Sequence, residues 1–139
     1  MKKSSTQQIL IGAISPASAG SLYQQIVDGI KLEVATGRLS SGEELPSFRA
    51  LAGQLLVSLI TVKRAYEELE REGIIYRRQG RGTFVAEQGG DLSRKAKLAR
   101  ATEHFQIGVE EAMGAGLKLA AISALVQNVI KERKAKSDE

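Results

Sequence analysis

Residues 58–73 read SLITVKRAYEELEREG, and this stretch decides the fold. Its apolar residues recur at intervals of three and four, as on the buried stripe of an amphipathic helix: Leu59, Val62, Ala65, Tyr66 and Leu69. Ser58 is a preferred residue type at a helix N-terminus, and Gly73 can adopt the left-handed conformation that ends a helix. The stretch therefore predicts a helix that starts after Ser58 and runs to Glu72.

A second, shorter helix is expected just before this one. Ser47 is a good N-cap, and apolar residues follow it on one side of a helix: Phe48, Leu51, Ala52 and Leu55. Only a turn at about Leu56-Val57 separates the two helices. Two helices joined by a tight turn form a helix-turn-helix, whose second helix enters the major groove of DNA.

A third helix is expected upstream, from Ser21 to just before Gly37. Ser21 and Gln24 have the spacing of a capping box, in which each side chain satisfies the backbone N–H of the other. The segment between this helix and the next, Leu39 to Pro46, contains Ser-Ser-Gly and predicts a turn.

A β-hairpin is expected after Gly73. Two β-prone runs, residues 74–78 and 83–86, flank Gln79-Gly80-Arg81-Gly82, where glycines allow a tight turn. Three helices followed by a hairpin make a winged helix-turn-helix, predicted at residues 21–87. The predicted fold class is mainly α with a small β-hairpin.

The flanking segments complete the predicted organisation. Residues 1–20 are expected to form an arm, in which Ile9-Leu10-Ile11 can add a short strand to a neighbour. Gln88-Gly89-Gly90 predicts a linker. Beyond it, two apolar stripes at helical spacing, broken near Gly114, predict a helical hairpin over residues 91–136. Its expected dimerisation residues are Leu98, Phe105, Val109, Leu119, Ile122 and Val126.

The apolar stripes of this hairpin are expected to need a partner surface. A two-helix segment of this length is too small to bury two wide stripes by itself. Packing on the winged domain of the same chain is one way to cover them. Pairing with a second protomer is favoured, which predicts a homodimer.

Composition limits the function and the location of the protein. The chain of 139 residues has no cysteine, which excludes disulfides and thiolate metal sites. It has no apolar run long enough to span a bilayer, and residues 9–14 are too few for a signal-peptide core. We therefore expect a cytoplasmic protein without a membrane partner. Residues 21–86 hold nine Lys and Arg against eight Asp and Glu, so binding to DNA requires that the basic side chains gather on one face.

Basic and polar residues do fall on the three elements that a winged helix presents to one duplex. Each of them alone is more often a solvated side chain or an ordinary turn, so the prediction depends on their coincidence. Lys63 and Arg64 can donate to guanine or phosphate, whereas Ile60 can make only apolar contact, for example with a thymine methyl. An arginine between two glycines at a hairpin tip suits the minor groove. The predicted DNA-binding residues are Arg49, Ser58, Ile60, Thr61, Lys63, Arg64, Arg78, Gly80, Arg81 and Gly82.

These residues resemble the GntR family of bacterial regulators over about half of the chain. The resemblance is carried by residues 21–26, 36–39, 45–49, 61–66, 69–73 and 78–85. It implies repression of transcription from a pseudo-palindromic operator, with DNA contacts from Arg49, Ser58, Thr61, Lys63, Gly80 and Arg81. Many members carry arginine and a polar residue where this chain has Leu59 and Ile60, so contacts do not transfer to these two positions. The short C-terminal region is similar to that of the YtrA-like subfamily, in which two helices serve mainly in dimerisation.

Two other classes of function are less favoured than DNA binding. An enzyme is disfavoured because the single histidine, His104, has no zinc-ligand spacing or nucleophile beside it, and Glu110 and Glu111 are adjacent on a helix and do not face each other. No cofactor is predicted. A winged helix can also bind RNA or another protein, and a small-molecule effector of unidentified chemistry stays open as a further partner.

Overall fold

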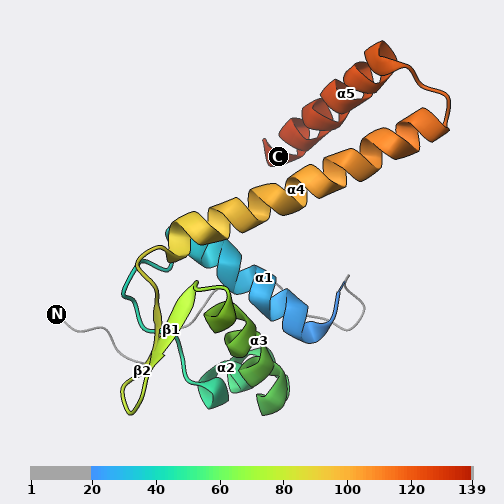
Figure 1. The fold of residues 1–139 in the computed structure, drawn as a ribbon. Coiled ribbons are helices and arrows are strands. Elements are labelled where there is room, and N and C mark those ends of the chain that lie inside the picture. The colour runs from blue at the N-terminus through green and yellow to red at the C-terminus, as the bar shows by residue number, and fades with distance from the viewer. Residues whose placement is uncertain (1–19, 139) are drawn as a thin grey trace. The chain divides into compact units, whose positions relative to one another are not determined.

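The computed structural model describes residues 20–138, and Figure 1 shows their five helices and two strands. The elements follow in the order α1 (Leu22–Ala35), α2 (Phe48–Leu55), α3 (Leu59–Arg71), β1 (Ile75–Arg78), β2 (Gly82–Val85), α4 (Gly89–Gly114) and α5 (Leu119–Ser137). This order confirms the predicted fold class. The predicted arm and its short strand at residues 9–11 lie outside the described residues. The chain divides into two compact units, with the boundary between Lys97 and Leu98.

Each of the first three helices begins at a serine that caps it. The Oγ atoms of Ser21, Ser47 and Ser58 accept hydrogen bonds from the backbone N–H three residues later, at 3.2, 3.1 and 3.2 Å. Each serine thereby satisfies a backbone donor that has no partner inside its helix. The Gln24 side chain, predicted to complete a capping box, donates instead to Asp28 at 3.0 Å. The three predicted helix starts are therefore confirmed.

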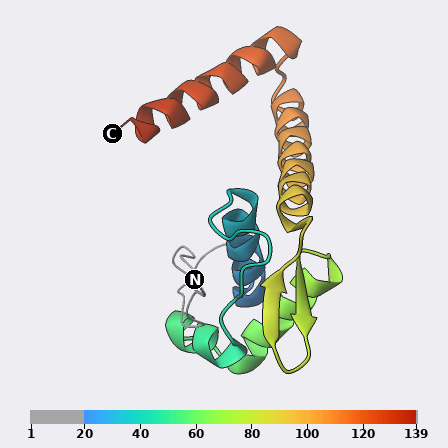
Figure 2. The same cartoon turned by 90° about the vertical axis from the view of Figure 1, so that its left-hand side faces the viewer.

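The first unit is built around one apolar core shared by α1, α2, α3 and the hairpin. Ile26, Ile30, Val62 and Leu69 are fully buried there. Figures 1 and 2 show α1 and α3 next to each other, with the hairpin at the C-terminal end of α3. Leu59 was predicted to be a core residue, and this is wrong: its side chain is 41% exposed. The buried stripe of α3 therefore starts at Val62, one turn later than predicted.

Tyr66 fixes the position of α2 against α3. Its hydroxyl donates to the carbonyl oxygen of Pro46 at 2.7 Å, in a buried site. Its ring meets the Phe48 ring edge to face, with 5.2 Å between the ring centroids. Burial raises the pKa of Tyr66, so the hydroxyl stays protonated and able to donate. These contacts hold the residues just before α2 and its first residue on α3.

Replacing Tyr66 by phenylalanine is expected to lower the free energy of unfolding by about 1–2 kcal/mol, because the buried Pro46 carbonyl loses its donor. Urea denaturation followed by circular dichroism measures the effect. Tyr76→Phe is the matched control, since Tyr76 is 40% exposed on the hairpin. Equal stability of the two variants would show that the hydroxyl of Tyr66 does not stabilise the fold.

A third chain segment, residues 42–45, pairs with the edge of β2 that faces away from β1. β1 and β2 pair antiparallel, with Ile75 opposite Val85 (Figure 2). On the other side of β2, the Leu45 N–H donates to Thr83 O at 2.8 Å and the Val85 N–H donates to Glu43 O at 2.9 Å. The prediction that residues 39–46 form only a turn is therefore wrong in part. The pairing is set by tertiary contact, which the polar sequence Gly-Glu-Glu does not indicate. It supports the base of β2 on both sides.

The first turn of α4 belongs to the first unit and packs tightly against its other elements. The predicted linker at residues 88–90 is wrong, because Gly89 is buried and begins α4. A Cβ atom at Gly89 would lie 2.7 Å from the carbonyl oxygen of Ile74 and 3.2 Å from Val85 Cγ1. The Arg94 Nη1 atom donates to Ala35 O at 2.9 Å, at the C-terminal end of α1. Glycine is needed here for a close approach of the backbone, and it does not loosen the chain.

Replacing Gly89 by alanine is therefore expected to lower the free energy of unfolding by about 1–3 kcal/mol, because the new methyl group meets a backbone oxygen that cannot easily move. Gly108→Ala is the control within the same helix. A Cβ atom at Gly108 meets nothing within 4 Å, so alanine there is expected to stabilise the protein by up to about 1 kcal/mol. Thermal unfolding of both variants checks the pair, and a shift in the same direction for both would refute this reading of Gly89.

The second unit is a pair of helix segments joined by a tight turn. Gly116 has a φ of +90°, and the Leu117 N–H donates to Ala112 O at 3.1 Å. Ala112 and Ile122 are buried, whereas Phe105 is 68% and Val126 41% exposed. Of the other predicted dimerisation residues, Leu98 and Leu119 are exposed and Val109 is half-buried. Both apolar stripes thus remain largely uncovered in the single chain. Within residues 20–138, no helix is long and apolar enough to cross a membrane.

Candidate nucleic-acid interface

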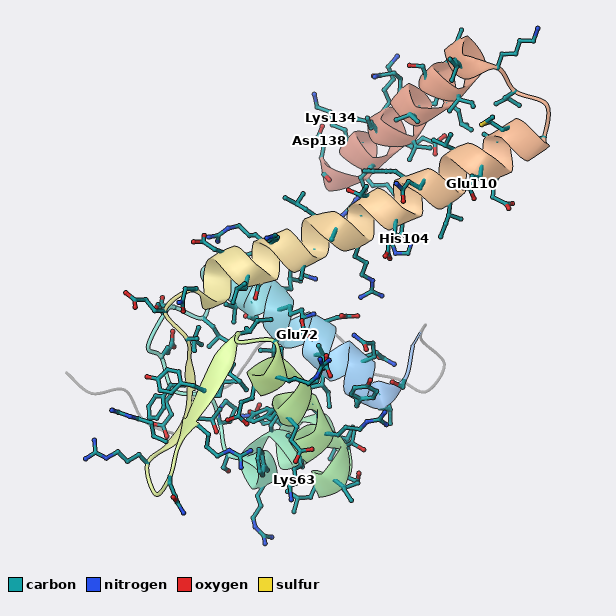
Figure 3. All side chains as sticks on the ribbon, in the orientation of Figure 1. Lys63, Glu72, His104, Glu110, Lys134 and Asp138 are labelled. Atoms are coloured by element: carbon teal, nitrogen blue, oxygen red, sulfur yellow. The ribbon has the colours of Figure 1, made fainter. Side chains whose placement is uncertain are left out.

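The first two turns of α3 present polar and apolar side chains away from the core. The Oγ atom of Ser58 caps the helix and lies 2.7 Å from Thr61 Oγ1, so each hydroxyl orients the other. Ile60 is 76% exposed, and Lys63 is exposed one turn further along. Lys63 lies toward the opposite end of α3 from Glu72 (Figure 3). This end of the helix is therefore free to meet a ligand.

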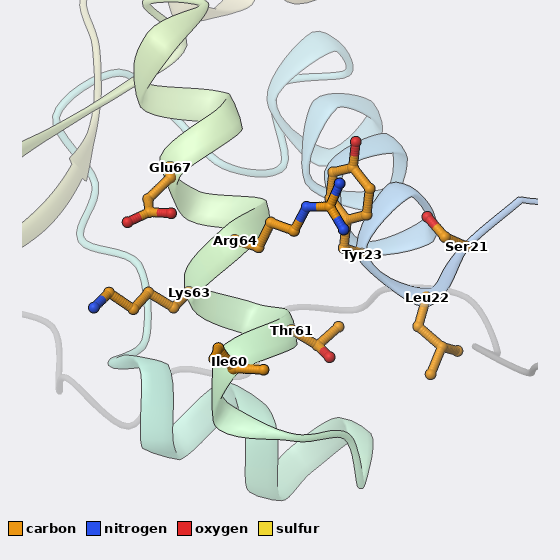
Figure 4. A pocket seen from close by; sticks show the side chains of 8 residues that line it. All are labelled: Ser21, Leu22, Tyr23, Ile60, Thr61, Lys63, Arg64 and Glu67. Carbon is orange, nitrogen blue, oxygen red and sulfur yellow. The ribbon is translucent and has the colours of Figure 1, made fainter.

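Arg64 points to the other side of α3 from Lys63 (Figure 4). Its guanidinium carbon lies 3.8 Å from the centroid of the Tyr23 ring on α1, a cation–π arrangement. Tyr23 was not among the predicted site residues. Its role depends on how α1 packs against α3, which no local sequence pattern indicates.

Residues at the start of α1 and of α3 enclose an open groove of about 670 Å³. Figure 4 shows the side chains that line it: Ser21, Leu22, Tyr23, Ile60, Thr61, Lys63, Arg64 and Glu67. The structure thus brings four predicted DNA-binding residues around one groove: Ile60, Thr61, Lys63 and Arg64. Ser58 lies just ahead of them as the N-cap of α3.

The hairpin tip is a tight turn that carries two exposed arginines, Arg78 and Arg81. The Arg81 N–H donates to Arg78 O at 2.9 Å, and Gly80 between them has a φ of +76°. Gly82 has a φ of +124°, and a Cβ atom there would lie 2.6 Å from Glu44 Oε2. Both glycines are therefore required by the turn itself and fix where the arginines stand.

A second groove, of about 430 Å³, separates the hairpin tip from the start of α2. The Arg77 guanidinium lies 4.9 Å from the centroid of the Phe48 ring across it. The groove is also lined by Arg78, Gly80, Arg81 and Gly82, so these four predicted residues come together with the start of α2. Arg49 is the second residue of α2, exposed, and lines neither groove.

Some basic residues of the first unit form ion pairs and others do not. Within residues 20–138, Lys31 pairs with Glu72 at 2.7 Å, Arg38 with Glu33 at 2.8 Å, and Arg71 with Glu68. The hydrogen bond from Arg71 lowers the pKa of Glu68, which keeps that carboxylate charged. In contrast, four exposed cations of α2, α3 and the hairpin have neither an ion pair nor a ring contact with the described residues: Arg49, Lys63, Arg78 and Arg81. The small net charge of the region is therefore unevenly distributed, and the unpaired positive charge of α2, α3 and the hairpin belongs to predicted site residues.

The described residues contain no cluster of potential metal ligands. Among the described residues, no group of three or more His, Asp or Glu side chains is placed to hold a metal ion. His104 is exposed on α4 in the second unit and lines neither groove.

Comparisons with known proteins agree with this arrangement. The sequence pattern of the bacterial regulatory proteins of the gntR family matches residues 22–85. The chain is 33% identical over 116 residues to the HTH-type transcriptional repressor YtrA of Bacillus subtilis, across 84% of this chain and 89% of that protein. A GntR family transcriptional regulator from Listeria monocytogenes superimposes with a TM-score of 0.68 at 33% identity, over 80% of this chain and 96% of the other. YtrA from Sulfolobus acidocaldarius, a GntR-family transcription factor, gives a TM-score of 0.53 at 34% identity, over 67% of this chain and 98% of the other.

Proposed function

Because the chain belongs to the gntR family of bacterial regulatory proteins, we propose that it binds double-stranded DNA as a homodimer and represses transcription from a pseudo-palindromic operator. The observation that carries the proposal is the set of four unpaired cations, Arg49, Lys63, Arg78 and Arg81, on α2, α3 and the hairpin. The other cations of these three elements, Arg64, Arg71 and Arg77, are paired with a carboxylate or stacked on an aromatic ring. Repression is proposed because the relative from Bacillus subtilis is named a repressor.

In the proposed complex, α3 lies in the major groove with its first two turns against the bases. Thr61 and Lys63 then donate to base edges or phosphates, and Ser58 holds the first turn in shape. The hairpin tip places Arg81 in the adjacent minor groove, where an inserted arginine is favoured by the negative potential. Arg49 and Arg78 contact the phosphate backbone and set the register of the protein on the duplex.

Arg64 has a different proposed role from its neighbour Lys63. Its stacking on Tyr23 draws the guanidinium toward α1 and away from the bases that Lys63 faces. We assign it to the phosphate backbone beside the major groove, where its charge adds to affinity without reading sequence.

The exposed stripes of α4 and α5 support the proposal that residues 91–136 dimerise. Phe105 and Val126 are large apolar side chains exposed in the single chain, and burial of such side chains against a second protomer would remove them from water. Two-fold pairing presents two copies of α3 to half-sites about one helical turn apart. The proposal includes a cytoplasmic location, where such an operator is found, and leaves the identity of any effector open.

Duplex DNA is favoured over duplex RNA on geometric grounds. The major groove of A-form RNA is deep and narrow and does not admit a helix, whereas that of B-form DNA is wide enough for α3. The hairpin tip also requires a minor groove narrow enough to concentrate negative potential around one arginine.

Selection from a library of random DNA duplexes, followed by fluorescence anisotropy on the selected sequence, tests the proposed function. We expect the selected duplex to bind at least about a hundredfold more tightly than a scrambled duplex or the matching RNA duplex. The affinity should fall steeply as salt increases, because bound counterions are released from the phosphates. Equal affinity for all three nucleic acids, or no binding at low salt, would contradict the proposal.

A further inference from the structure

Two large apolar side chains are exposed at the turn of the helix-turn-helix and at the start of its second helix. Leu56, in the turn between α2 and α3, is 91% exposed, and Ile60, in the first turn of α3, is 76% exposed. We call these two side chains the apolar tip. Neither takes part in the core of the first unit. Water therefore covers both of them in the free protein, and this costs free energy that burial against a ligand would recover.

Leu56 is also held in an unfavourable backbone conformation. Its φ and ψ are +57° and +46°, and within residues 20–138 it is the one residue other than glycine with a positive φ. Glycine adopts this conformation without steric cost, whereas a leucine does not. Since the exposed Leu56 side chain gains little from packing, the folded state alone gives no reason for a leucine at this position. Backbone strain of this kind collects at functional sites.

We infer that the apolar tip recognises thymine through its 5-methyl group, so that the operator of this protein carries thymine in each half-site opposite Leu56 and Ile60. The inference rests on the proposed function. In the major groove, the thymine methyl is the apolar group that an aliphatic side chain can contact, and the other base edges there are polar. Ile60 has no atom that donates or accepts a hydrogen bond, so it cannot read guanine, adenine or cytosine by their polar edges.

The surroundings of the apolar tip favour DNA as its occupant over an apolar protein surface. Lys63 lies on the same exposed face one turn further along α3, and its charge has no partner within residues 20–138. Ser58 and Thr61, whose hydroxyls lie 2.7 Å from each other, belong to the same start of α3 as Ile60. An apolar protein partner would have to bury these polar groups and this charge without compensation, whereas phosphates and base edges can pair with them.

The first test changes single atoms of the DNA. In the duplex obtained by selection, each thymine of one half-site is replaced in turn by deoxyuridine, which keeps the base pair and removes only the methyl group. We expect one or two positions at which wild-type protein loses about three- to fivefold in affinity, as for one buried methyl group. Ile60→Ala or Leu56→Gly should bind the thymine and deoxyuridine forms of those positions equally well.

The second test separates DNA recognition from folding. Leu56→Gly removes the side chain and relieves the positive φ, so the variant is expected to be at least as stable as the wild type to thermal unfolding. Its affinity for the selected duplex should nevertheless fall by about tenfold or more, as expected when a buried leucine side chain is lost from an interface. Leu32→Ala, which removes a 45% exposed leucine from α1, is the control and should leave the affinity unchanged.

The outcomes distinguish this inference from the function on which it rests. If the protein selects no sequence and binds no duplex, both fail. If it binds a selected duplex tightly, but deoxyuridine at every thymine leaves the affinity unchanged, the function stands and the apolar tip does not read thymine. Selected half-sites that contain no thymine would overturn the inference in the same way.

Discussion

Lys63→Ala is expected to weaken binding to the selected operator by about a hundredfold. Loss of one bidentate or charged contact to a base costs about 1–3 kcal/mol, and a dimer loses the contact in both half-sites. Lys63 is exposed and paired with none of the described residues, so its removal should leave the free energy of unfolding unchanged. Fluorescence anisotropy at several salt concentrations measures both the affinity and its salt dependence.

A change of charge elsewhere provides the matched control for Lys63. Lys136→Ala removes the same charge from the exposed end of α5 in the second unit. It should change the operator affinity by less than about twofold, because Lys136 lies outside the helix-turn-helix and the hairpin that are proposed to contact DNA. Equal losses for Lys63→Ala and Lys136→Ala would mean that only overall charge matters and that the first turns of α3 read no bases.

Phe105→Glu is expected to convert the protein from a dimer to a monomer at micromolar concentration. Phe105 is 68% exposed in the single chain, so glutamate there does not disturb the packing of the second unit. At the centre of an apolar interface, however, the same carboxylate would be buried without a partner. A two-fold dimer contains two copies of it, so the cost to dimerisation is several kcal/mol. Sedimentation equilibrium measures the change. The operator affinity should fall together with dimerisation, because each monomer then holds only one half-site.

Gln106→Glu is the matched control for Phe105→Glu. It places the same charge on the neighbouring exposed position of α4, turned about 100° around the helix. This variant should remain dimeric. Monomers in both variants would show that charge on α4 is enough to prevent association, and dimers in both would place the interface elsewhere.

Much of the first unit could be predicted from the sequence because its signals are local. The serines at 21, 47 and 58 each cap a helix whose apolar stripe follows at once, and the glycines of the hairpin tip mark its turn. Leu59 was misplaced because periodicity indicates which side of a helix an apolar residue occupies. It does not indicate whether another element reaches that part of the helix.

The features that the sequence did not predict depend on contacts between distant segments. Residues 42–45 pair with β2 although Gly-Glu-Glu at 42–44 is not a β-prone sequence, and Gly89 is a packing residue although Gly-Gly is typical of linkers. In the candidate interface, the stacking of Arg64 on Tyr23 joins α3 to α1 across forty residues of sequence. The sequence does not predict the left-handed conformation of Leu56 either, because glycine or asparagine is the residue expected in that conformation.

The central claim is that the first two turns of α3 and the hairpin tip form the surface that meets DNA. It is tested most directly by backbone amide chemical shifts of isotope-labelled protein, recorded with and without the selected duplex. The account predicts that the largest changes fall at residues 58–64 and 78–82, with little change at the C-terminal end of α1 around Lys31 to Ala35. Changes concentrated at that end of α1, with residues 58–64 and 78–82 unmoved, would contradict it.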